Sequence, residues 1–330
     1  MKILIVGLGS VGRRHLRNLV ALGQTDLVLL RSGRSTLPDE ELKGYRVVGN
    51  LADALQARPD AAVIATPTSL HLETAIPLAR AGCHLLLEKP VSHTMDGVSE
   101  LRAAVAKGRG QVMVAYQYRH HPGLQAVRQW LKDGAVGRSL VAHAHYGDFL
   151  PGWHPWEDYR QAYSARAALG GGVVLTLCHP LDYLLWLLGD VVQVTAATSA
   201  QAGFGIDVED CAQAALTFAS GALGGVHLNY VQRPPSHRLT VVGTEGSITW
   251  DQADGAARIF RAGAGAWEVS EAPAGYQRND MFVAETRAFL DVAAGKATAE
   301  PSLADGIRSL ELALAILESA QRGRRIDLTG

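Results

Sequence analysis

The chain has 330 residues, of which 48% are hydrophobic and 19% charged, and its formal net charge is -1. A single hydrophobic core rarely grows beyond about 250–300 residues, so two domains are expected. No apolar run is long enough to cross a bilayer, and no lysine- or arginine-rich block provides the electrostatic footprint of a nucleic-acid-binding protein. The composition therefore argues against nucleic-acid and membrane partners and favours a globular protein.

Cysteine usage indicates the compartment. Cys83, Cys178 and Cys211 are far apart, and no C-x-x-C pair offers redox or metal-ligand spacing. The histidines of the Trp/His segment near residue 154 lack third and fourth ligands at a recognisable spacing. We therefore expect a cytoplasmic protein without disulfides and without a metal site.

Short apolar runs alternate with helical segments over the first part of the chain. Strands are expected at 3–6, 27–30, 47–48, 61–65, 84–87 and 112–116, and helices at 11–22, 51–57 and 70–81. Buried strands that alternate with helices predict a parallel, doubly wound sheet, because each crossover must cover a face of the sheet. Residues 1–120 are therefore assigned to a doubly wound, Rossmann-like domain of α/β class.

The pattern changes from about residue 122. Helices are expected at 124–132, at 173–188 after three glycines, and at 302–321, and β-rich runs at 140–146, 191–199, 212–218, 225–230, 238–242 and 247–250. Such runs predict a mostly antiparallel sheet. Residues 121–330 are therefore assigned to a second domain of α+β type with a large open sheet, whose terminal helix can pack back on the first domain.

A G-x-G-x-x-G motif follows the first expected strand and opens the first expected helix. In this context the glycines let a pyrophosphate approach the backbone, and the helix N-terminus supplies free N–H groups and a positive dipole end. A glycine turn without a ligand is the alternative. The residues expected to bind the dinucleotide here are Gly7, Gly9, Ser10, Val11 and Gly12.

The end of the second expected strand bears on the choice between NAD and NADP. An acidic residue commonly holds the ribose 2′-hydroxyl of NAD at this place, but Arg31, Ser32 and Arg34 stand here instead. Arginine and serine can pair with a 2′-phosphate. The sequence therefore predicts a preference for NADP, with NAD as the alternative if these arginines are only solvated loop residues.

Three further stretches resemble motifs of the Gfo/Idh/MocA oxidoreductases, the family of glucose-fructose oxidoreductase and inositol dehydrogenase. Ala65-Thr66-Pro67 with His71 is similar to the family's A-T-P-x-x-x-H segment, and Glu88-Lys89-Pro90 matches its E-K-P motif. Three glycines followed by His179-Pro180-Leu181-Asp182 resemble its G-G-G…H-x-x-D helix. The motifs occur in family order and span nearly the whole chain.

This resemblance implies a Rossmann domain, a second domain whose sheet builds homodimers or homotetramers, and an active site between the domains. It implies that Lys89, next to a cis Lys89–Pro90 bond, contacts the nicotinamide ribose and the reacting hydroxyl, and that His179 exchanges the substrate proton. It also extends the residues expected to bind the dinucleotide to Thr66, Pro67, His71, Glu88 and Lys89.

The chemistry of a secondary alcohol fits these two residues. Oxidation needs a base near neutrality, a role open to histidine and to a lysine whose pKa is lowered by burial or a neighbouring cation. Asp182 shares a helix face with His179 and can fix its tautomer. Many relatives carry an aspartate shortly before the histidine, where this chain has Leu175 and Thr176. Thr176 can hydrogen-bond but carries no charge, so the catalytic set can reduce to Lys89 and His179. Without the resemblance, a surface lysine and a core histidine are the alternatives.

Aromatic and charged residues gather at 117–122 and 153–166. Such residues suit a sugar, because aromatic rings pack against its C–H faces and polar groups bind its hydroxyls. The arginines also suit a carboxylate or a phosphate. An ordered packing loop is the alternative for the second segment. The expected substrate-binding residues are Tyr118, Arg119, His121, Trp153, Trp156, Tyr159, Arg160, Tyr163, Arg166 and His179.

The sequence thus predicts an NAD(P)-dependent oxidoreductase that transfers a hydride between the nicotinamide and a secondary hydroxyl or ketone. The expected substrate is a sugar, cyclic polyol, sugar acid or nucleotide sugar. Two alternatives stay open. One is a glycosidase of the same fold that retains its dinucleotide, and the other is a non-catalytic NADP-binding regulator, suggested by the missing aspartate.

Overall fold

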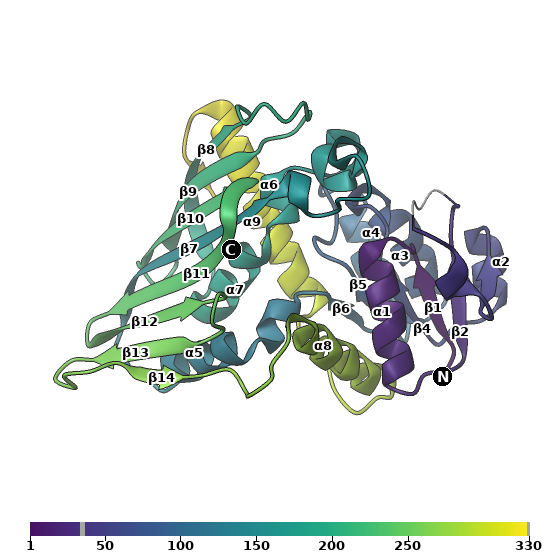
Figure 1. Ribbon diagram of the computed structural model, residues 1–330, viewed down its shortest axis with the longest axis horizontal. Coiled ribbons are helices and arrows are strands. Elements are labelled where there is room, and N and C mark those ends of the chain that lie inside the picture. Colours follow the sequence, from purple (N-terminus) through teal and green to yellow (C-terminus); the bar gives the residue numbers. More distant parts are fainter. Residues whose placement is uncertain (34–36, 329–330) are drawn as a thin grey trace. The chain divides into compact units, whose positions relative to one another are not determined.

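The computed structural model describes residues 1–33 and 37–328 and divides into two compact units (Figure 1). The first unit comprises Met1–Gln117, Ala168–Gly170 and Arg278–Ile307, and the second comprises Tyr118–Ala167, Gly171–Gln277 and the chain from Arg308. The first unit therefore includes a late stretch, Arg278–Ile307, that the sequence pattern assigns to the second domain.

The first unit contains a parallel sheet of six strands in the order β3-β2-β1-β4-β5-β6, which confirms the doubly wound Rossmann arrangement. Its central strands are buried on both faces, as their continuous apolar sequences require. The strands are β1 (Ile3–Val6), β2 (Leu27–Leu30), β3 (Arg46–Val48), β4 (Ala61–Ile64), β5 (His84–Leu87) and β6 (Val112–Val114).

Helices and 3-10 turns connect these strands. Two helices, α4 and α8, lie in segments where the sequence pattern indicates none, and α8 packs against α1. The elements are α1 (Ser10–Ala21), η1 (Glu40–Leu42), α2 (Leu51–Gln56), η2 (Thr68–Leu70), α3 (His71–Arg80), α4 (Val98–Lys107) and α8 (Arg278–Ala293).

The second unit contains a nine-stranded sheet in the order β14-β13-β12-β11-β7-β10-β9-β8-β15. β7 and β10 pair in parallel, and the other described pairs of this sheet are antiparallel, so the predicted mostly antiparallel sheet is confirmed. The strands are β7 (Ser139–Phe149), β8 (Val191–Ser199), β9 (Cys211–Phe218), β10 (Leu223–Asn229), β11 (Val231–Gly243), β12 (Gly246–Asp251), β13 (Ala257–Arg261), β14 (Glu268–Ser270) and β15 (Ile326–Asp327).

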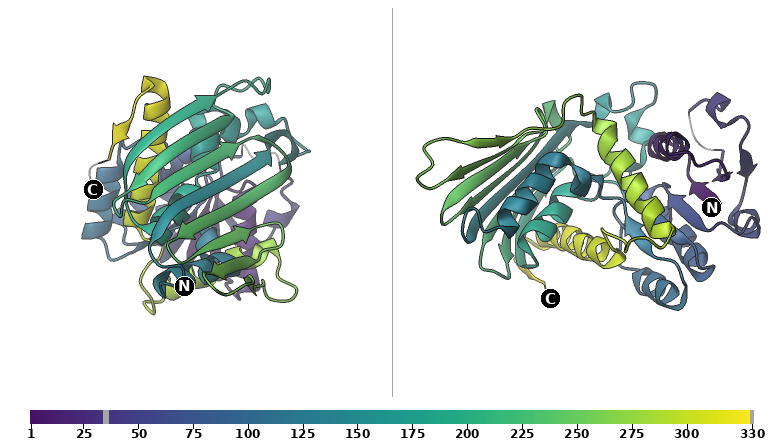
Figure 2. Two further views of the ribbon diagram at one scale, coloured as in Figure 1. Left: turned by 90° about the vertical axis from the view of Figure 1, so that its left-hand side faces the viewer. Right: turned by 90° about the horizontal axis from the view of Figure 1, so that it is seen from below.

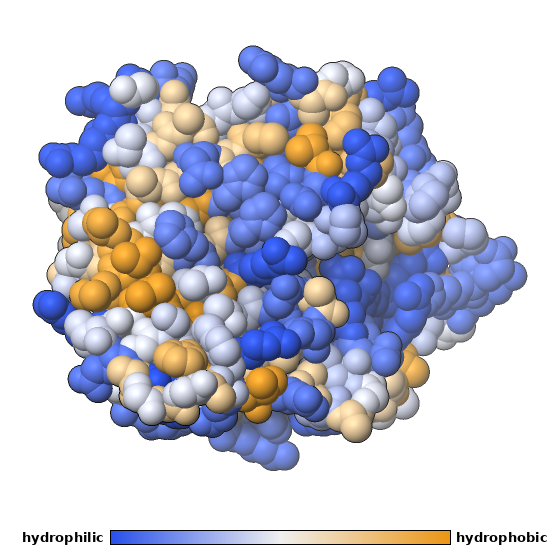
Figure 3. Space-filling model, turned by 60° about the vertical axis from the view of Figure 1, so that its left-hand side comes forward, coloured by the Kyte–Doolittle hydropathy of each residue, from blue (hydrophilic) through white to orange (hydrophobic). Residues whose placement is uncertain are grey.

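Helices cover one face of this sheet, and the left view of Figure 2 shows that no described helix covers the other. Figure 3 shows apolar side chains on that side of the molecule. The helices are α5 (Pro122–Lys132), α6 (Val173–Thr176), α7 (His179–Leu188) and α9 (Leu303–Arg322), and the 3-10 turns are η3 (Gln117–His120), η4 (Leu150–Gly152), η5 (Tyr159–Gln161), η6 (Tyr163–Ala165) and η7 (Ala167–Leu169).

The single helix predicted at 173–188 is wrong, because the structure divides it into α6 and α7 with a bend of 49°. Pro180 explains the break: it has no N–H to donate to the carbonyl of Thr176, and its ring would clash with that carbonyl in a continuous helix. His179 consequently begins α7. Within the described residues no single helix meets the length and apolarity needed to span a membrane, although this bent pair meets them jointly.

Candidate active site

The glycine loop joins β1 to α1 in the first unit. A Cβ on Gly12 would lie 1.9 Å from the carbonyl oxygen of Gly7, and a Cβ on Gly7, whose φ is +84°, would lie 2.5 Å from the oxygen of Ala65. These two positions therefore require glycine. Gly9, the N-cap of α1, has no atom of the described residues within 4 Å of its Cβ position, so its backbone is open on that side. An open backbone at a helix N-terminus fits a dinucleotide pyrophosphate.

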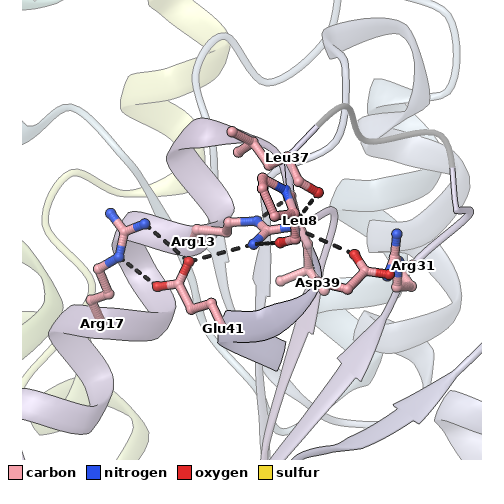
Figure 4. A network of polar contacts seen from close by, with 8 residues as sticks. Leu8, Arg13, Arg17, Arg31, Leu37, Asp39 and Glu41 are labelled. Atoms are coloured by element: carbon pink, nitrogen blue, oxygen red, sulfur yellow. Dashed lines mark hydrogen bonds and ion pairs between the residues drawn. The ribbon is translucent and has the colours of Figure 1, made fainter. Parts of the chain in front are cut away.

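The end of β2 carries a network of charged side chains, shown in Figure 4. Arg31 Nη1 lies 2.5 Å from Asp39 Oδ2, and this hydrogen bond is the main reason why the pKa of Asp39 is lowered. The carboxylate that the sequence lacks directly after β2 is thus supplied by a later loop. Ser32 is exposed, and Arg34 lies outside the described residues.

Arg13 and Arg17 of α1 hold this loop in place. Arg13 donates to the carbonyl oxygens of Leu8 and Leu37 at 3.0 and 3.1 Å, and Arg17 Nε donates to Glu41 Oε1 at 2.5 Å (Figure 4). The fixed fork of a guanidinium suits such multiple acceptors. Asp39 is therefore carried by a loop that is anchored to α1, the helix after the glycine loop.

His71 is buried and links two loops at the carboxyl edge of the sheet. Its Nδ1 lies 2.8 Å from the oxygen of Pro90, and its Nε2 lies 3.0 Å from the oxygen of Thr66. Burial lowers the pKa of His71, while its contacts with the two carbonyl oxygens and the charge of Glu88 act in the opposite direction. This geometry gives His71 the role of a clamp between the Thr66-Pro67 and Lys89-Pro90 segments.

Glu88 and Lys89 follow β5 directly. Glu88 is buried, with Oε1 2.8 Å from His15 Nε2 and Oε2 accepting the backbone N–H of Lys89 at 3.2 Å. Burial acts to raise the pKa of Glu88, but His15, Lys89 and His71 together outweigh it and lower the pKa. The side chain of Lys89 is only partly buried, and the Lys89–Pro90 bond is cis, as predicted. An ammonium at the carboxyl end of a parallel strand stands where open α/β sheets bind ligands.

In the second unit, His179 packs against Tyr118. The two rings meet edge to face, with centroids 4.8 Å apart, and both residues are buried in this unit. Tyr118 contacts His237 of β11 in the same way at 4.7 Å, and Tyr183 Oη lies 3.2 Å from His237 Nε2. His237 belongs to no motif, so no sequence signal could have identified it.

Asp182 is paired with Arg119, one of the residues expected to bind substrate. Arg119 Nε and Nη2 donate to the two carboxylate oxygens at 3.0 and 2.7 Å, and the side chains of Arg119 and Asp182 are only 5% and 2% exposed. The guanidinium also lies 5.5 Å from the ring of Trp186. This bidentate pair ties η3 to α7, the helix that begins at His179.

We expect Asp182→Ala to lower the free energy of unfolding by about 3–5 kcal/mol, because it leaves the Arg119 charge buried without its partner. Denaturant unfolding measures this change. Asp158→Ala is the matched control, since the side chains of the Asp158–Arg160 pair are 40% and 56% exposed, and its loss is expected to change stability little. Equal losses in the two variants would contradict the structural role given to Asp182.

Two other predicted residues are held by their neighbours. His121 Nδ1 accepts the N–H of Gly123 at 3.1 Å as the N-cap of α5, and burial lowers the pKa of His121 to about 4. Thr176 is buried, and burial also raises the pKa of the nearby Tyr230. His121 is thus tied to the start of α5.

The 153–166 segment combines anchored and exposed side chains. Trp153 packs edge-on against Tyr230 with ring centroids 5.5 Å apart, and Tyr159 Oη donates to the oxygen of Phe204 at 2.9 Å. Trp156 is 57% exposed. Arg160 and Arg166 are exposed, and Tyr163 is partly buried. The segment therefore presents one exposed indole, that of Trp156, together with two exposed guanidinium groups.

A hollow elsewhere in the first unit does not coincide with these residues. Its volume is about 870 Å³, and it is lined by Met1, Asp60, His84 and Lys296, among others. It lies at the amino ends of β1, β4 and β5, the edge opposite the carboxyl ends where ligands bind. Within residues 1–33 and 37–328, no group of three or more His, Cys, Asp or Glu side chains is placed to hold a metal ion.

Known proteins resemble the chain over most of its length. The family model "Oxidoreductase family, NAD-binding Rossmann fold" matches residues 1–116, and the model "GFO/IDH/MocA C-terminal domain" matches residues 124–249. Levoglucosan dehydrogenase of Pseudarthrobacter phenanthrenivorans is 27% identical over 314 residues, covering 80% of this chain and 79% of that protein.

Two solved structures share the fold. Levoglucosan dehydrogenase in complex with NADH has a TM-score of 0.90 at 22% identity, covering 100% of this chain and 99% of that chain. The WlbA dehydrogenase of Bordetella pertussis, in complex with NADH and UDP-GlcNAcA, has a TM-score of 0.84 at 25% identity, with coverage of 100% and 99%.

Proposed function

Because the chain belongs to the Gfo/Idh/MocA oxidoreductase family, we propose that it is an NAD(P)-dependent dehydrogenase or reductase. The substrate carries a secondary hydroxyl or ketone and is a sugar, cyclic polyol, sugar acid or nucleotide sugar. The observation that carries the proposal is the glycine loop, in which Gly7 and Gly12 are enforced by close backbone contacts while the backbone at Gly9 is open. Packing within the chain accounts for Gly7 and Gly12, and the open backbone at Gly9 at the helix N-terminus is what suits an anionic ligand.

Lys89 and His179 have separate proposed roles. When bound, a nicotinamide dinucleotide supplies the hydride acceptor or donor. The Lys89 ammonium donates a hydrogen bond to the oxygen of the reacting hydroxyl, and the neighbouring Glu88, whose pKa the charge of Lys89 helps to lower, balances that positive charge. His179 Nε2 or Nδ1 takes the hydroxyl proton during oxidation and returns it during reduction. Arg119, Asp182 and Tyr118 hold the imidazole in position.

The exposed aromatic and arginine side chains support a carbohydrate substrate. The indole of Trp156 offers a flat apolar plate for the C–H face of a sugar, and Arg160 and Arg166 suit hydroxyl, carboxylate or phosphate groups. Relatives at this distance are named for carbohydrates, among them levoglucosan and UDP-N-acetylglucosamine. We therefore propose these residues, together with Tyr159 and Tyr163, as substrate contacts.

The proposal is tested by mixing the protein with NAD⁺ or NADP⁺ and a panel of inositols, aldoses, uronates and nucleotide sugars. A dehydrogenase gives a stoichiometric rise in absorbance at the band of the reduced nicotinamide. Release of free sugar without that rise indicates a glycosidase that retains its dinucleotide. Tight dinucleotide binding without turnover on any member of the panel indicates a regulator, and either of these outcomes contradicts the proposal.

We further propose a preference for NADP, in which the 2′-phosphate replaces Asp39 as the partner of Arg31. Asp39→Asn is then expected to tighten NADPH binding by about tenfold, because the guanidinium loses a competing carboxylate. NADH, which has no 2′-phosphate, gains nothing. Dissociation constants from nicotinamide fluorescence check this, with Glu41→Gln as an acid-to-amide control in the same loop. A clear NADH preference that Asp39→Asn leaves unchanged would refute the proposal.

A homodimer or homotetramer through the free face of the nine-stranded sheet is also proposed. Leu223, Val141 and Val242 are register partners on β10, β7 and β11, so their side chains form an apolar stripe across this face. Leu223 is 57% exposed in the single chain. Large exposed apolar side chains of this kind mark association surfaces.

The free thiols of Cys83, Cys178 and Cys211 support a reducing, cytoplasmic location.

A further inference from the structure

A carboxyl group without a partner lies inside the first unit. Glu285 of α8 is fully buried, and neither of its side-chain oxygens has a hydrogen-bond partner among the described residues. An ionised carboxylate in such surroundings loses its hydration and gains nothing in return. Glu285 is therefore a neutral carboxylic acid, although no motif or proposed catalytic step accounts for it.

The packing of α8 on α1 places Glu285 near the dinucleotide loop. Asn279 Nδ2 donates to Asn18 Oδ1 at 2.9 Å, and the guanidinium of Arg14 lies 4.5 Å from the ring of Phe282. The two helices therefore run antiparallel. One further turn along α8 brings Glu285 level with the first turn of α1, directly after the glycine loop.

A second carboxyl group, Glu88, faces the same region and differs from Glu285 in its surroundings. Glu88 accepts from His15 and from the backbone of Lys89, whereas Glu285 has no donor within the described parts of the chain. The pKa of Glu285 is raised well above its usual value, first by burial and then by the charge of Glu88.

The other charged and titratable groups around Glu88 are cationic or neutral, and they belong to α1, to α3 and to the segment that follows β5. These groups are Arg14 and His15 of α1, His71 of α3 and Lys89 after β5. They stabilise a negative charge on Glu88. A negative charge on Glu88 disfavours a second one on Glu285, which has no donor to stabilise it.

We propose that Glu285 is a positioning residue that holds the one proton of a Glu88–Glu285 pair, so that a single negative charge stands behind Lys89. The link between Glu285 and catalysis rests on the proposed function, in which the Lys89 ammonium acts on the substrate. A second negative charge would draw that ammonium away from the substrate side and would repel a pyrophosphate at the glycine loop.

The test compares the pH dependence of stability in Glu285→Gln and the wild type, both without dinucleotide. Glutamine has the shape of the protonated acid but does not titrate. The pKa of Glu285 is higher in the folded protein than in the unfolded chain. The free energy of unfolding therefore falls as the pH rises above the pKa of the unfolded chain. The unfolding constant of the wild type relative to the variant should therefore rise by up to about tenfold per pH unit from about pH 5. A ratio that does not change with pH would overturn the proposal.

Two variants sharpen the comparison. Asp291→Asn makes the same acid-to-amide change at a partly buried position of α8, and the pH slope belongs to Glu285 only if this control lacks it. The second comparison is made at pH 7 in proteins that already carry Glu88→Gln. There, adding Glu285→Gln should change the unfolding constant severalfold less than it does in the wild type, because the charge of Glu88 that repels an ionised Glu285 is gone. An equal change in both proteins would show that the two carboxyl groups are independent and would refute the shared proton.

If Glu285→Gln does not fold, infrared spectroscopy gives a separate readout. The wild type should show the C=O stretching band of a protonated carboxylic acid at pH 7, and Glu285→Met should lack it. Absence of the band in the wild type would overturn the proposal. These measurements need no turnover, so failure of the proposed hydride transfer in the substrate panel is distinguishable from failure of the Glu285 inference.

Discussion

Lys89→Met is expected to lower kcat by about 10²–10⁴-fold, the range that a positioned acid–base or hydrogen-bonding group contributes. Methionine approximates the length of the side chain but cannot donate to the reacting oxygen. The Lys89 backbone stays bonded to Glu88 Oε2 in this variant, so the loop after β5 keeps its structure. Initial rates of nicotinamide reduction, with the dissociation constant for NADH measured in parallel, give the result.

Lys107→Met is the matched control, because Lys107 is an exposed residue of α4 and should change kcat little. His179→Ala is expected to fall in the same range as Lys89→Met, since it removes the group that moves the proton. Near-wild-type kcat in either active-site variant, with a normal melting temperature, would show that its proposed role is wrong.

Gly9→Val is expected to weaken NADH binding by about 100-fold or more while leaving the melting temperature unchanged. The loss follows from the removal of two or more charge-assisted backbone hydrogen bonds to the pyrophosphate, each contributing about 1.5–3 kcal/mol. The fold should tolerate the change because no atom of the described chain lies within 4 Å of the new Cβ, and because Gly9 has a φ of -74°, which any residue adopts. Fluorescence titration with NADH and thermal unfolding measure both quantities.

Gly12→Ala distinguishes a loss of NADH affinity from a loss of stability. Its Cβ would lie 1.9 Å from the carbonyl oxygen of Gly7, so this smaller change should reduce the stability of the apo protein as well as its affinity. If Gly9→Val bound NADH as tightly as the wild type, the dinucleotide would have to bind elsewhere.

The six strands of the first sheet and β7 to β12 of the second could be predicted because their apolar patterns are continuous or alternating. β13, β14 and β15 could not, since strands of five, three and two residues are too short to show such a pattern. α8 could not, since Glu285 and Thr286 interrupt the apolar residues of its buried face and conceal the helical period. α4 was missed because only three of its residues, Val98, Leu101 and Ala104, are buried. The break before α7 was missed because Pro180 also suits the first turn of a helix, so its effect depends on the helix that precedes it.

The motif residues of the site could be found in the sequence, but their partners could not. Glu88 and His15 are 73 residues apart, and Arg119 and Asp182 are 63 residues apart. Such pairings arise only when the sheet and helices have assembled. The same reason explains Asp39, whose carboxylate reaches the end of β2 from a neighbouring loop and is invisible to a rule that inspects only the residue after the strand.

Hydride transfer itself is tested most directly by an isotope experiment on the first substrate that the panel identifies. The protein is supplied with a reduced dinucleotide that carries deuterium at both positions of the nicotinamide C4 and with the ketone form of that substrate, and the product is examined by mass spectrometry and NMR. We expect one deuteron on the carbinol carbon of the product and one left on the oxidised dinucleotide. A product without deuterium on that carbon, or a dinucleotide that keeps both deuterons while product forms, would contradict the proposed reaction.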